Sequence, residues 1–147
     1  SRAVESAALW TTNAGSKAST CPLGSLVFPK RGGAIGTNKK RILIRSAILD
    51  PNLMGVSPKT DVMTTQFLAG WFEGFNLSDI ASGSSVPQLN KKDLAPLSIS
   101  LPSLERQNEY GCRIAELERI STYASRALQE SKLLFASSQH NAFRGAV

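Results

Sequence analysis

The sequence has few of the side chains that metal sites and nucleophilic catalysis need. Its 147 residues include two cysteines, Cys21 and Cys112, and a single histidine, His140. A structural zinc site takes four nitrogen or sulfur ligands, so this set cannot form an ordinary one. The cysteines lie far apart in sequence, and we expect both to remain free thiols. His140 lies in a polar segment, where we expect a surface residue and not a general base.

Long apolar runs are missing as well. No run approaches the roughly 18 residues that cross a membrane. The first ten residues, SRAVESAALW, contain an acidic residue and lack the apolar core of a signal peptide. We therefore expect a single soluble, cytoplasmic domain with an appendage, with no membrane among its partners.

No catalytic group of residues stands out. The carboxylates at Asp61, Glu73, Asp79 and Asp93 are scattered without a defined spacing. The glycine-rich stretch GGAIGTNKK, residues 32–40, does not match the phosphate-binding pattern GxxxxGK[ST], and a strand is expected after it instead of a helix. We therefore expect a non-catalytic protein with no cofactor and no metal, and a binding function.

Acidic residues are absent from one long interval. Residues 6–49 contain no Asp or Glu, and the whole chain has a net charge of +6. The interval contains seven basic residues, namely Lys17, Lys30, Arg31, Lys39, Lys40, Arg41 and Arg45. A basic surface on the globular part is typical of a module that binds polyanions. The alternative is an ordinary solvated face, which basic runs often form.

Hydrophobic periodicity predicts an α+β fold, with a small mixed globular domain in residues 1–101. Short strands are expected at SLVF (25–28), RILIRSAI (41–48), NLMGV (52–56) and LSISL (97–101). In the second of these runs, Ile42 and Ile44 are expected on one face and Leu43 on the other. Pro29 is expected to break the first strand.

The same domain is expected to contain one aromatic helix. Residues 64–75, TTQFLAGWFEGF, carry large apolar side chains at helical spacing. Trp71 and Phe72 are expected in the core, although aromatic rings can also stack on bases. Residues 81–94 are polar and are expected to form a loop, and the glycines of residues 30–36 predict a turn.

A long helix is predicted for residues 102–147. Ser103 can cap it, and Glu105 places a negative charge in the first turn, where the helix dipole favours it. Running to about Ala142, the helix would span roughly 40 residues and about 60 Å. Gly111 weakens it by about 1 kcal/mol relative to Ala, so a kink there is an alternative to a straight helix.

An apolar seam runs along this helix in alternating steps of four and three residues, which is the coiled-coil period. Small residues within the seam allow another helix to approach closely. The residues expected to contact a partner helix are Ile114, Leu117, Ile120, Ala124, Leu128, Leu134 and Phe135. The alternative is that the helix folds back onto its own globular domain.

The basic turn and the polar loop form a candidate DNA interface. Basic side chains beside a glycine turn can neutralise phosphates, and amides can pair with base edges. The predicted contacts are Lys30, Arg31, Lys39, Lys40, Arg41, Ser84, Gln88, Asn90, Lys91 and Lys92. The alternative for the loop is a solvated connector.

Several motifs follow one another in a characteristic order. LVFPKRGGAIGTNKKRILI (26–44) and DPNLMGVSP (50–58) precede a glycine–serine loop and the junction LPSLERQ (101–107). The helix end supplies matches at Leu134, Ala142, Phe143 and Gly145. Over roughly residues 24–147 the chain resembles the specificity subunits of type I restriction–modification enzymes, in which a Leu-Pro-Pro-Leu-x-x-Gln junction leads into a long helix.

The resemblance implies a non-catalytic function. In this family a target-recognition domain reads DNA sequence, and a long helix serves as spacer and docking element. A full subunit has two such domains and two helices, packed as an antiparallel coiled coil. Methyltransferase subunits bind it and bring the S-adenosylmethionine chemistry, and a restriction subunit joins to cut DNA.

One domain and one helix correspond to half of such a subunit, with a globular part that is shortened at its N-terminus. We expect this half to bind DNA, to pair with a second copy through its helix, and to bind the methyltransferase subunit and the restriction subunit. The alternative is a truncated protein-interaction module that docks on a methyltransferase or specificity subunit without reading DNA.

Overall fold

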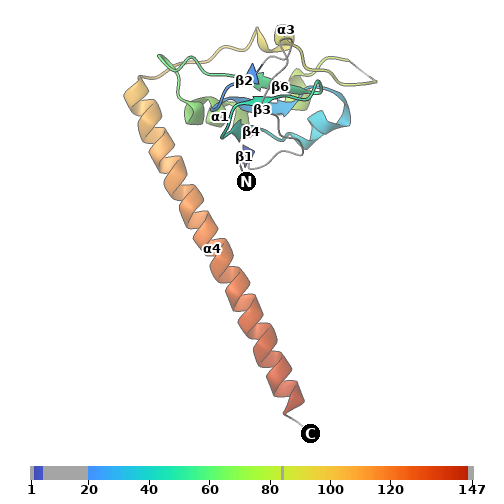
Figure 1. The fold of residues 1–147 in the computed structure, drawn as a ribbon, viewed down its shortest axis with the longest axis vertical. Helices are drawn as coiled ribbons and strands as arrows, with labels where there is room; N and C mark the ends of the chain where they lie inside the picture. Colours follow the sequence, from blue (N-terminus) through green and yellow to red (C-terminus); the bar gives the residue numbers. More distant parts are fainter. Residues whose placement is uncertain (1, 5–19, 84, 146–147) are drawn as a thin grey trace. The chain divides into compact units, whose positions relative to one another are not determined.

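The structure, a computed structural model, describes residues 2–4, 20–83 and 85–145 (Figure 1). The fold is α+β, as the sequence predicts: short strands in two small sheets, an aromatic helix, and a long C-terminal helix. The chain divides into two compact units, Ser1–Asn108 and Glu109–Val147. The first turn of the long helix, which starts at Leu104, belongs to the first unit.

The strands of the described residues form two sheets. The larger has the order β1-β4-β3-β6, and the smaller pairs β2 with β5. Within the larger sheet β1 runs parallel to β4, and the other neighbours are antiparallel. The strands are β1 Ala3–Val4, β2 Thr20–Cys21, β3 Leu26–Pro29, β4 Arg41–Leu43, β5 Ala47–Ile48 and β6 Leu53–Val56. The strands predicted at residues 25–28 and 52–56 are thus confirmed, with Pro29 as the last residue of β3.

The strand predicted at residues 41–48 is wrong in its length and its faces. The chain bends at residues 44–45, so that β4 lies in one sheet and β5 in the other. Leu43 is 3% exposed, whereas Ile44 after it is 50% exposed. Alternation holds only along a continuous strand, so the bend removes Ile44 from the buried face.

The strand predicted at residues 97–101 is also wrong. This segment pairs with no strand of the described residues. The Leu97 N–H instead closes a turn by donating to the carbonyl of Leu94 at 3.0 Å. Pro96 and Pro102 flank the segment and supply no N–H donors, which limits ladder formation. The alternating pattern here belongs to an extended connector.

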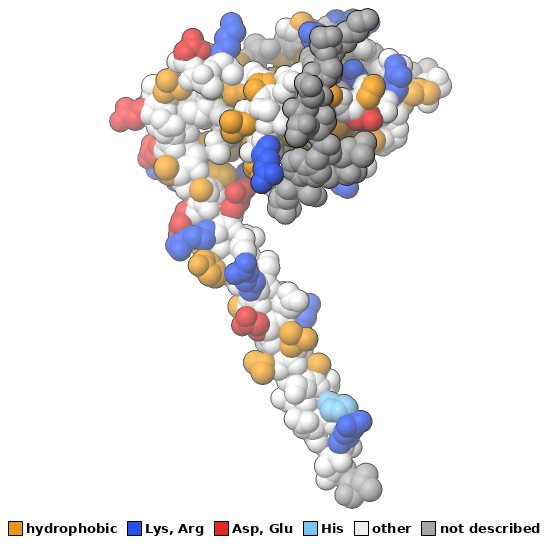
Figure 2. Space-filling model, in the orientation of Figure 1, with side chains coloured by type: hydrophobic (Ala, Val, Ile, Leu, Met, Phe, Trp, Pro, Cys, Tyr) orange, Lys and Arg blue, Asp and Glu red, His pale blue; other side chains and the backbone are white. Residues whose placement is uncertain are grey.

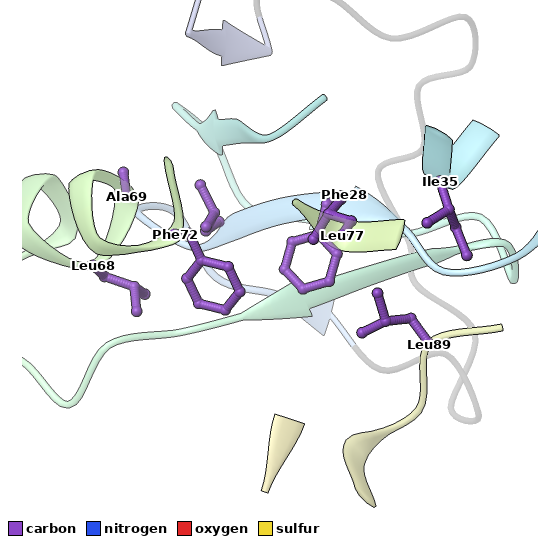
Figure 3. Packing of buried hydrophobic residues seen from close by; sticks show 8 residues of the cluster. Phe28, Ile35, Leu68, Ala69, Phe72, Leu77 and Leu89 are labelled. Atoms are coloured by element: carbon purple, nitrogen blue, oxygen red, sulfur yellow. The ribbon is translucent and has the colours of Figure 1, made fainter. Parts of the chain in front are cut away.

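One core holds the first unit together (Figure 3). Helix α1, Thr65–Glu73, is capped by Thr64 and confirms the predicted aromatic helix. Phe72 of α1 packs on Phe28 of β3 with ring centroids 5.3 Å apart. Leu77 of the short helix α2, Leu77–Ile80, is fully buried beside them. Burying a side chain of this size stabilises the fold by about 1.5–3 kcal/mol.

Two further parts of the chain complete this core. The turn predicted at residues 30–36 is a 3₁₀-helix, η1 Gly32–Thr37, and its Ile35 is fully buried. Leu89, in the segment predicted as a polar loop, is also fully buried. Figure 3 shows Ile35 and Leu89 near one end of the cluster and Leu68 and Ala69 of α1 near the other.

The long helix, α4 Leu104–Arg144, has 41 residues and is about 60 Å long. Ser103 caps it as predicted, because its hydroxyl accepts from the Arg106 N–H at 3.5 Å. The helix runs unbroken through Gly111. No helix of the described residues is long and apolar enough to cross a membrane.

Gln107 fixes the first turn of α4 within the first unit. Its side chain is fully buried, and its amide donates to the carbonyls of Val62 and Pro102, both at 2.9 Å. Its Oε1 accepts from the N–H of Thr64, the capping residue of α1, at 2.8 Å. A buried amide with all of these partners joins the start of α4 to the start of α1.

Candidate nucleic-acid interface

The structure brings together two segments that the sequence predicts to contact DNA. Arg31, just after β3, and Gln88, in the predicted loop, are partners in an antiparallel bridge. Hydrogen bonds on both sides support the bridge, since the Leu89 N–H donates to the Lys30 carbonyl at 2.9 Å and the Gly32 N–H to the Pro87 carbonyl at 2.8 Å. The basic turn and the loop therefore form one surface.

The loop itself is a structured hairpin. Ser82 and Gln88 exchange two backbone hydrogen bonds of 2.7 Å. Gly83 has a φ of 97°, and a Cβ there would lie 2.8 Å from the Val86 carbonyl oxygen. Only glycine fits this turn without strain. Ser84 lies outside the described residues, so its predicted DNA contact stays a prediction.

A short helix follows the hairpin and displays two lysines. Helix α3, Lys91–Leu94, starts after Asn90, whose N–H donates to the Asp93 carboxylate at 2.7 Å. Asn90, Lys91 and Lys92 are exposed, and Leu89 beside them is anchored in the core. The sequence did not indicate this anchor, because a single leucine among polar residues is a weak signal.

The side chains at this surface have few internal partners. Arg31 is exposed, and Gln88 and Lys30 are half-buried. The Arg31 and Gln88 side chains form no hydrogen bond or ion pair with any described residue, nor do those of Lys91 and Lys92. Their charges and amide groups are therefore available to a ligand.

Lys40 is a correction to the predicted set of DNA contacts. Its side chain is only 3% exposed, and its ammonium donates to Asn38 Oδ1 at 2.9 Å and to the Phe75 carbonyl at 2.7 Å. Desolvation on burial lowers the pKa of Lys40, an effect that the negative charge of Glu73 opposes. Lys40 ties the start of β4 to the chain between α1 and α2, so it cannot reach a phosphate.

The neighbours of Lys40 in sequence, Asn38, Lys39 and Arg41, lie at or just before the start of β4. Asn38 adopts the left-handed conformation with a φ of 51°, and its Oδ1 also accepts from the Leu77 N–H at 2.9 Å. Arg41 is half-buried and donates to the Lys40 carbonyl at 2.9 Å, whereas Lys39 is exposed. The predicted contacts thus fall into two groups, one around the Arg31–Gln88 bridge and one at the start of β4.

Basic side chains are spread over the face of the globular unit that Figure 2 shows. Among the predicted contacts, those around the Arg31–Gln88 bridge are brought together from two segments, whereas Lys39 lies at the start of β4. The grouping of the residues, more than the net charge, marks this surface.

The second candidate surface is the apolar seam of α4. Ile114 is half-buried, and the other predicted seam residues are exposed. Examples are Leu117 at 61%, Leu128 at 58%, Leu134 at 70% and Phe135 at 64% exposed. Ion pairs at Arg113–Glu109 and Arg119–Glu116 lie near the start of the helix. Figure 2 shows hydrophobic side chains exposed along the visible face of the helix, among charged and other side chains.

Comparisons with known proteins do not assign this chain to a family. No protein-family model matches it, and no curated protein matches it significantly. The two surfaces that could bind a partner are the group around the Arg31–Gln88 bridge and the seam of α4.

Proposed function

We propose that this chain is a half-size specificity subunit of a type I restriction–modification system. The subunit is non-catalytic and cytoplasmic, its globular unit binds DNA, and α4 pairs with a second copy. A methyltransferase subunit and a restriction subunit supply the chemistry. The single observation that supports this most is the Arg31–Gln88 bridge, which joins the two predicted DNA-contact segments into one surface.

The chemistry of that surface suits DNA. Arg31, Lys91 and Lys92 carry positive charges that can neutralise phosphates, and that neutralisation releases counterions and supplies affinity. Gln88 and Asn90 lie among them and offer amides for base edges. The surface combines sequence-independent attraction with groups able to distinguish bases, which is the combination that a recognition domain needs.

The seam of α4 suits a partner helix. Its apolar side chains follow the coiled-coil period, and covering them stabilises a complex by about 25 cal/mol for each Å² of apolar surface buried. Ser121, Ala124 and Ser131 lie in the seam between the large side chains and permit close approach. A two-fold dimer through this seam gives two recognition domains and a two-part, symmetric DNA target.

Mobility shift at two salt concentrations, combined with light scattering, tests the proposal. We expect a dimer whose DNA affinity falls steeply as salt rises, with a slope of about 0.9 for each phosphate neutralised. A monomer that binds no DNA at low salt would contradict the proposal.

A matched pair of lysine variants sharpens this test. Lys92→Ala removes an exposed charge beside the bridge, and Lys59→Ala removes an exposed charge elsewhere in the same unit. We expect Lys92→Ala alone to lower the affinity, with a salt slope smaller by about 1. Equal effects of the two variants would show that only net charge matters.

A second candidate function is a protein-interaction module that reads no DNA. The observation that favours it is the long exposed seam of α4, which can bind a methyltransferase or an intact specificity subunit whatever the globular unit does. Co-purification with such a partner, without any shift of a mixed DNA pool, would select this function over the first.

A further inference from the structure

Arg31 and Gln88 lie directly opposite each other across the bridge between their two segments. Arg31 has extended backbone, with φ −145° and ψ 140°. Opposed residues of an antiparallel pair project from the same face, with their Cβ atoms about 4.5–5.5 Å apart. The guanidinium and the amide therefore emerge side by side.

The residues next to them belong to the other face. Side chains alternate along extended backbone, so Lys30 and Leu89 point away from the face of Arg31 and Gln88. The burial of Leu89 at 0% exposure agrees with this, since its face is the core side. Ser82, opposite Gln88 across the second bridge, shares this face, which thus presents Arg31, Gln88 and Ser82 without the neighbouring Lys30.

From this placement we infer that Arg31 and Gln88 form a base-reading pair, Arg31 for a guanine and Gln88 for an adenine in the next base pair. The inference rests on the proposed DNA-binding function and adds which residues read sequence. Lys91 and Lys92, on α3, contact phosphates and carry no sequence information.

The chemistry of the two side chains fixes the bases. Arginine donates two hydrogen bonds to O6 and N7 of guanine, and glutamine pairs with N6 and N7 of adenine, both in the major groove. Successive base pairs are about 3.4 Å apart along the duplex. Side chains that begin about 5 Å apart and are free to converge can reach two adjacent pairs.

Hydrogen bonds within the globular unit hold the backbone that carries Arg31 and Gln88. Gln88 is held on one side by the bridge to Arg31 and on the other by two hydrogen bonds of 2.7 Å to Ser82. Neither the Arg31 nor the Gln88 side chain has a partner among the described residues that it must leave in order to bind. Ordering this part of the chain therefore costs little on binding, which favours specific recognition.

The experiment is selection of bound duplexes from a randomised pool by the full chain, followed by sequencing. We expect the wild type to enrich a site containing guanine next to adenine. Arg31→Ala should lose the guanine preference and keep the adenine preference, and Gln88→Ala should do the reverse. Arg31→Lys keeps the charge but lacks the planar fork, so it should also lose guanine discrimination, by about tenfold or more.

Lys92→Ala is the matched control, because it removes an exposed side chain of the same surface. It should lower the total DNA bound and leave the selected sequence unchanged. Circular dichroism of each variant, compared with that of the wild type, is the control for a retained fold.

The outcomes separate the two claims. Bound DNA whose base preference is the same for the wild type, Arg31→Ala and Gln88→Ala overturns the base-reading pair and leaves the proposed function standing. Bound DNA without any base preference does the same. If the wild type retains no DNA at low salt, the proposed function fails, and the base-reading pair fails with it.

Discussion

The two units of this chain differ most in how far their apolar side chains are buried. In Ser1–Asn108, ten hydrophobic residues are 5% exposed or less. In Glu109–Val147, no described residue is buried, and large side chains such as Phe135 and Leu134 are more than half exposed. The first unit is stabilised by its own core. The described residues of the second form helical hydrogen bonds, two ion pairs and a cation–π contact between Arg119 and Tyr123, so similar substitutions should have different consequences in the two units.

The largest contrast should come from removing one phenylalanine in each unit. Phe28→Ala empties a site that is 1% exposed and should lower the free energy of unfolding by about 3–5 kcal/mol. Phe135→Ala, at a site 64% exposed, should change the unfolding of the globular unit by less than about 0.5 kcal/mol. Urea titration followed by tryptophan fluorescence measures both.

Phe135→Ala should instead weaken the proposed dimer, which light scattering over a dilution series measures. A Phe135→Ala variant that destabilises the globular unit as much as Phe28→Ala does would show that α4 packs on that unit. The two units would then share one core.

The second largest effect should come from Gln107, where the two units meet in sequence. Gln107→Ala leaves the Thr64 N–H and the carbonyls of Val62 and Pro102 without this partner, and each unsatisfied buried group costs about 1–3 kcal/mol. Asn108→Ala is the control, because Asn108 is the next residue along the helix and is exposed. Thermal melts should show a large loss for the first variant and almost none for the second; similar losses would refute the role given to Gln107.

A smaller effect, dependent on pH, should come from Lys40. Because burial lowers its pKa in the folded state below the usual 10.5, the unfolded chain binds more protons between the two values. Stability contributed by Lys40 should therefore rise as the pH rises through that window. Lys40→Met removes the titration and leaves the Phe75 carbonyl without its donor, at a net cost of about 1 kcal/mol at neutral pH.

The measurement is the free energy of unfolding of the wild type and of Lys40→Met from pH 7 to pH 10. The free energy of unfolding of the wild type, relative to that of Lys40→Met, should increase as the pH rises. Exposed Lys39, changed to Met, is the control and should show a constant difference. An advantage that shrinks with pH would mean that the charged form of Lys40 is the favoured one in the fold.

The smallest effect should come from Gly111 in α4. Gly111→Ala should stabilise the helix by up to about 1 kcal/mol, because glycine loses more backbone entropy than alanine. Circular dichroism should show slightly higher helix content and the same melting of the globular unit. A loss of helix would indicate that a partner packs closely against Gly111.

The sequence predicted the elements that have strong local patterns. The aromatic helix α1, the long helix α4 and its cap at Ser103 were predicted because period and capping are local properties. The strand predicted at residues 97–101 was wrong because a strand needs a neighbour, and no local pattern reports one.

The candidate site was predicted in part. Arg31 and Gln88 were both named, but 57 positions of sequence separate them, and only the fold shows that they pair. Lys40 was predicted on the surface because lysines are usually exposed. Its two acceptors, Asn38 Oδ1 and the Phe75 carbonyl, are brought to it only by folding. Gln107 lies in the junction LPSLERQ, but its role could not be predicted, since its partners are backbone groups that carry no sequence signal.

Leu89 separates Gln88 from Asn90 and has a consequence for how this surface could change. Its side chain is held in the core, and this fixes the main chain next to Gln88. The residue at position 88 can then be exchanged without repacking the interior, whereas Asn90 is the N-cap of α3 and has a structural role. The hairpin can therefore change this surface side chain while its backbone keeps its place, and position 88 is the natural starting point for engineering the DNA selectivity of the proposed interface.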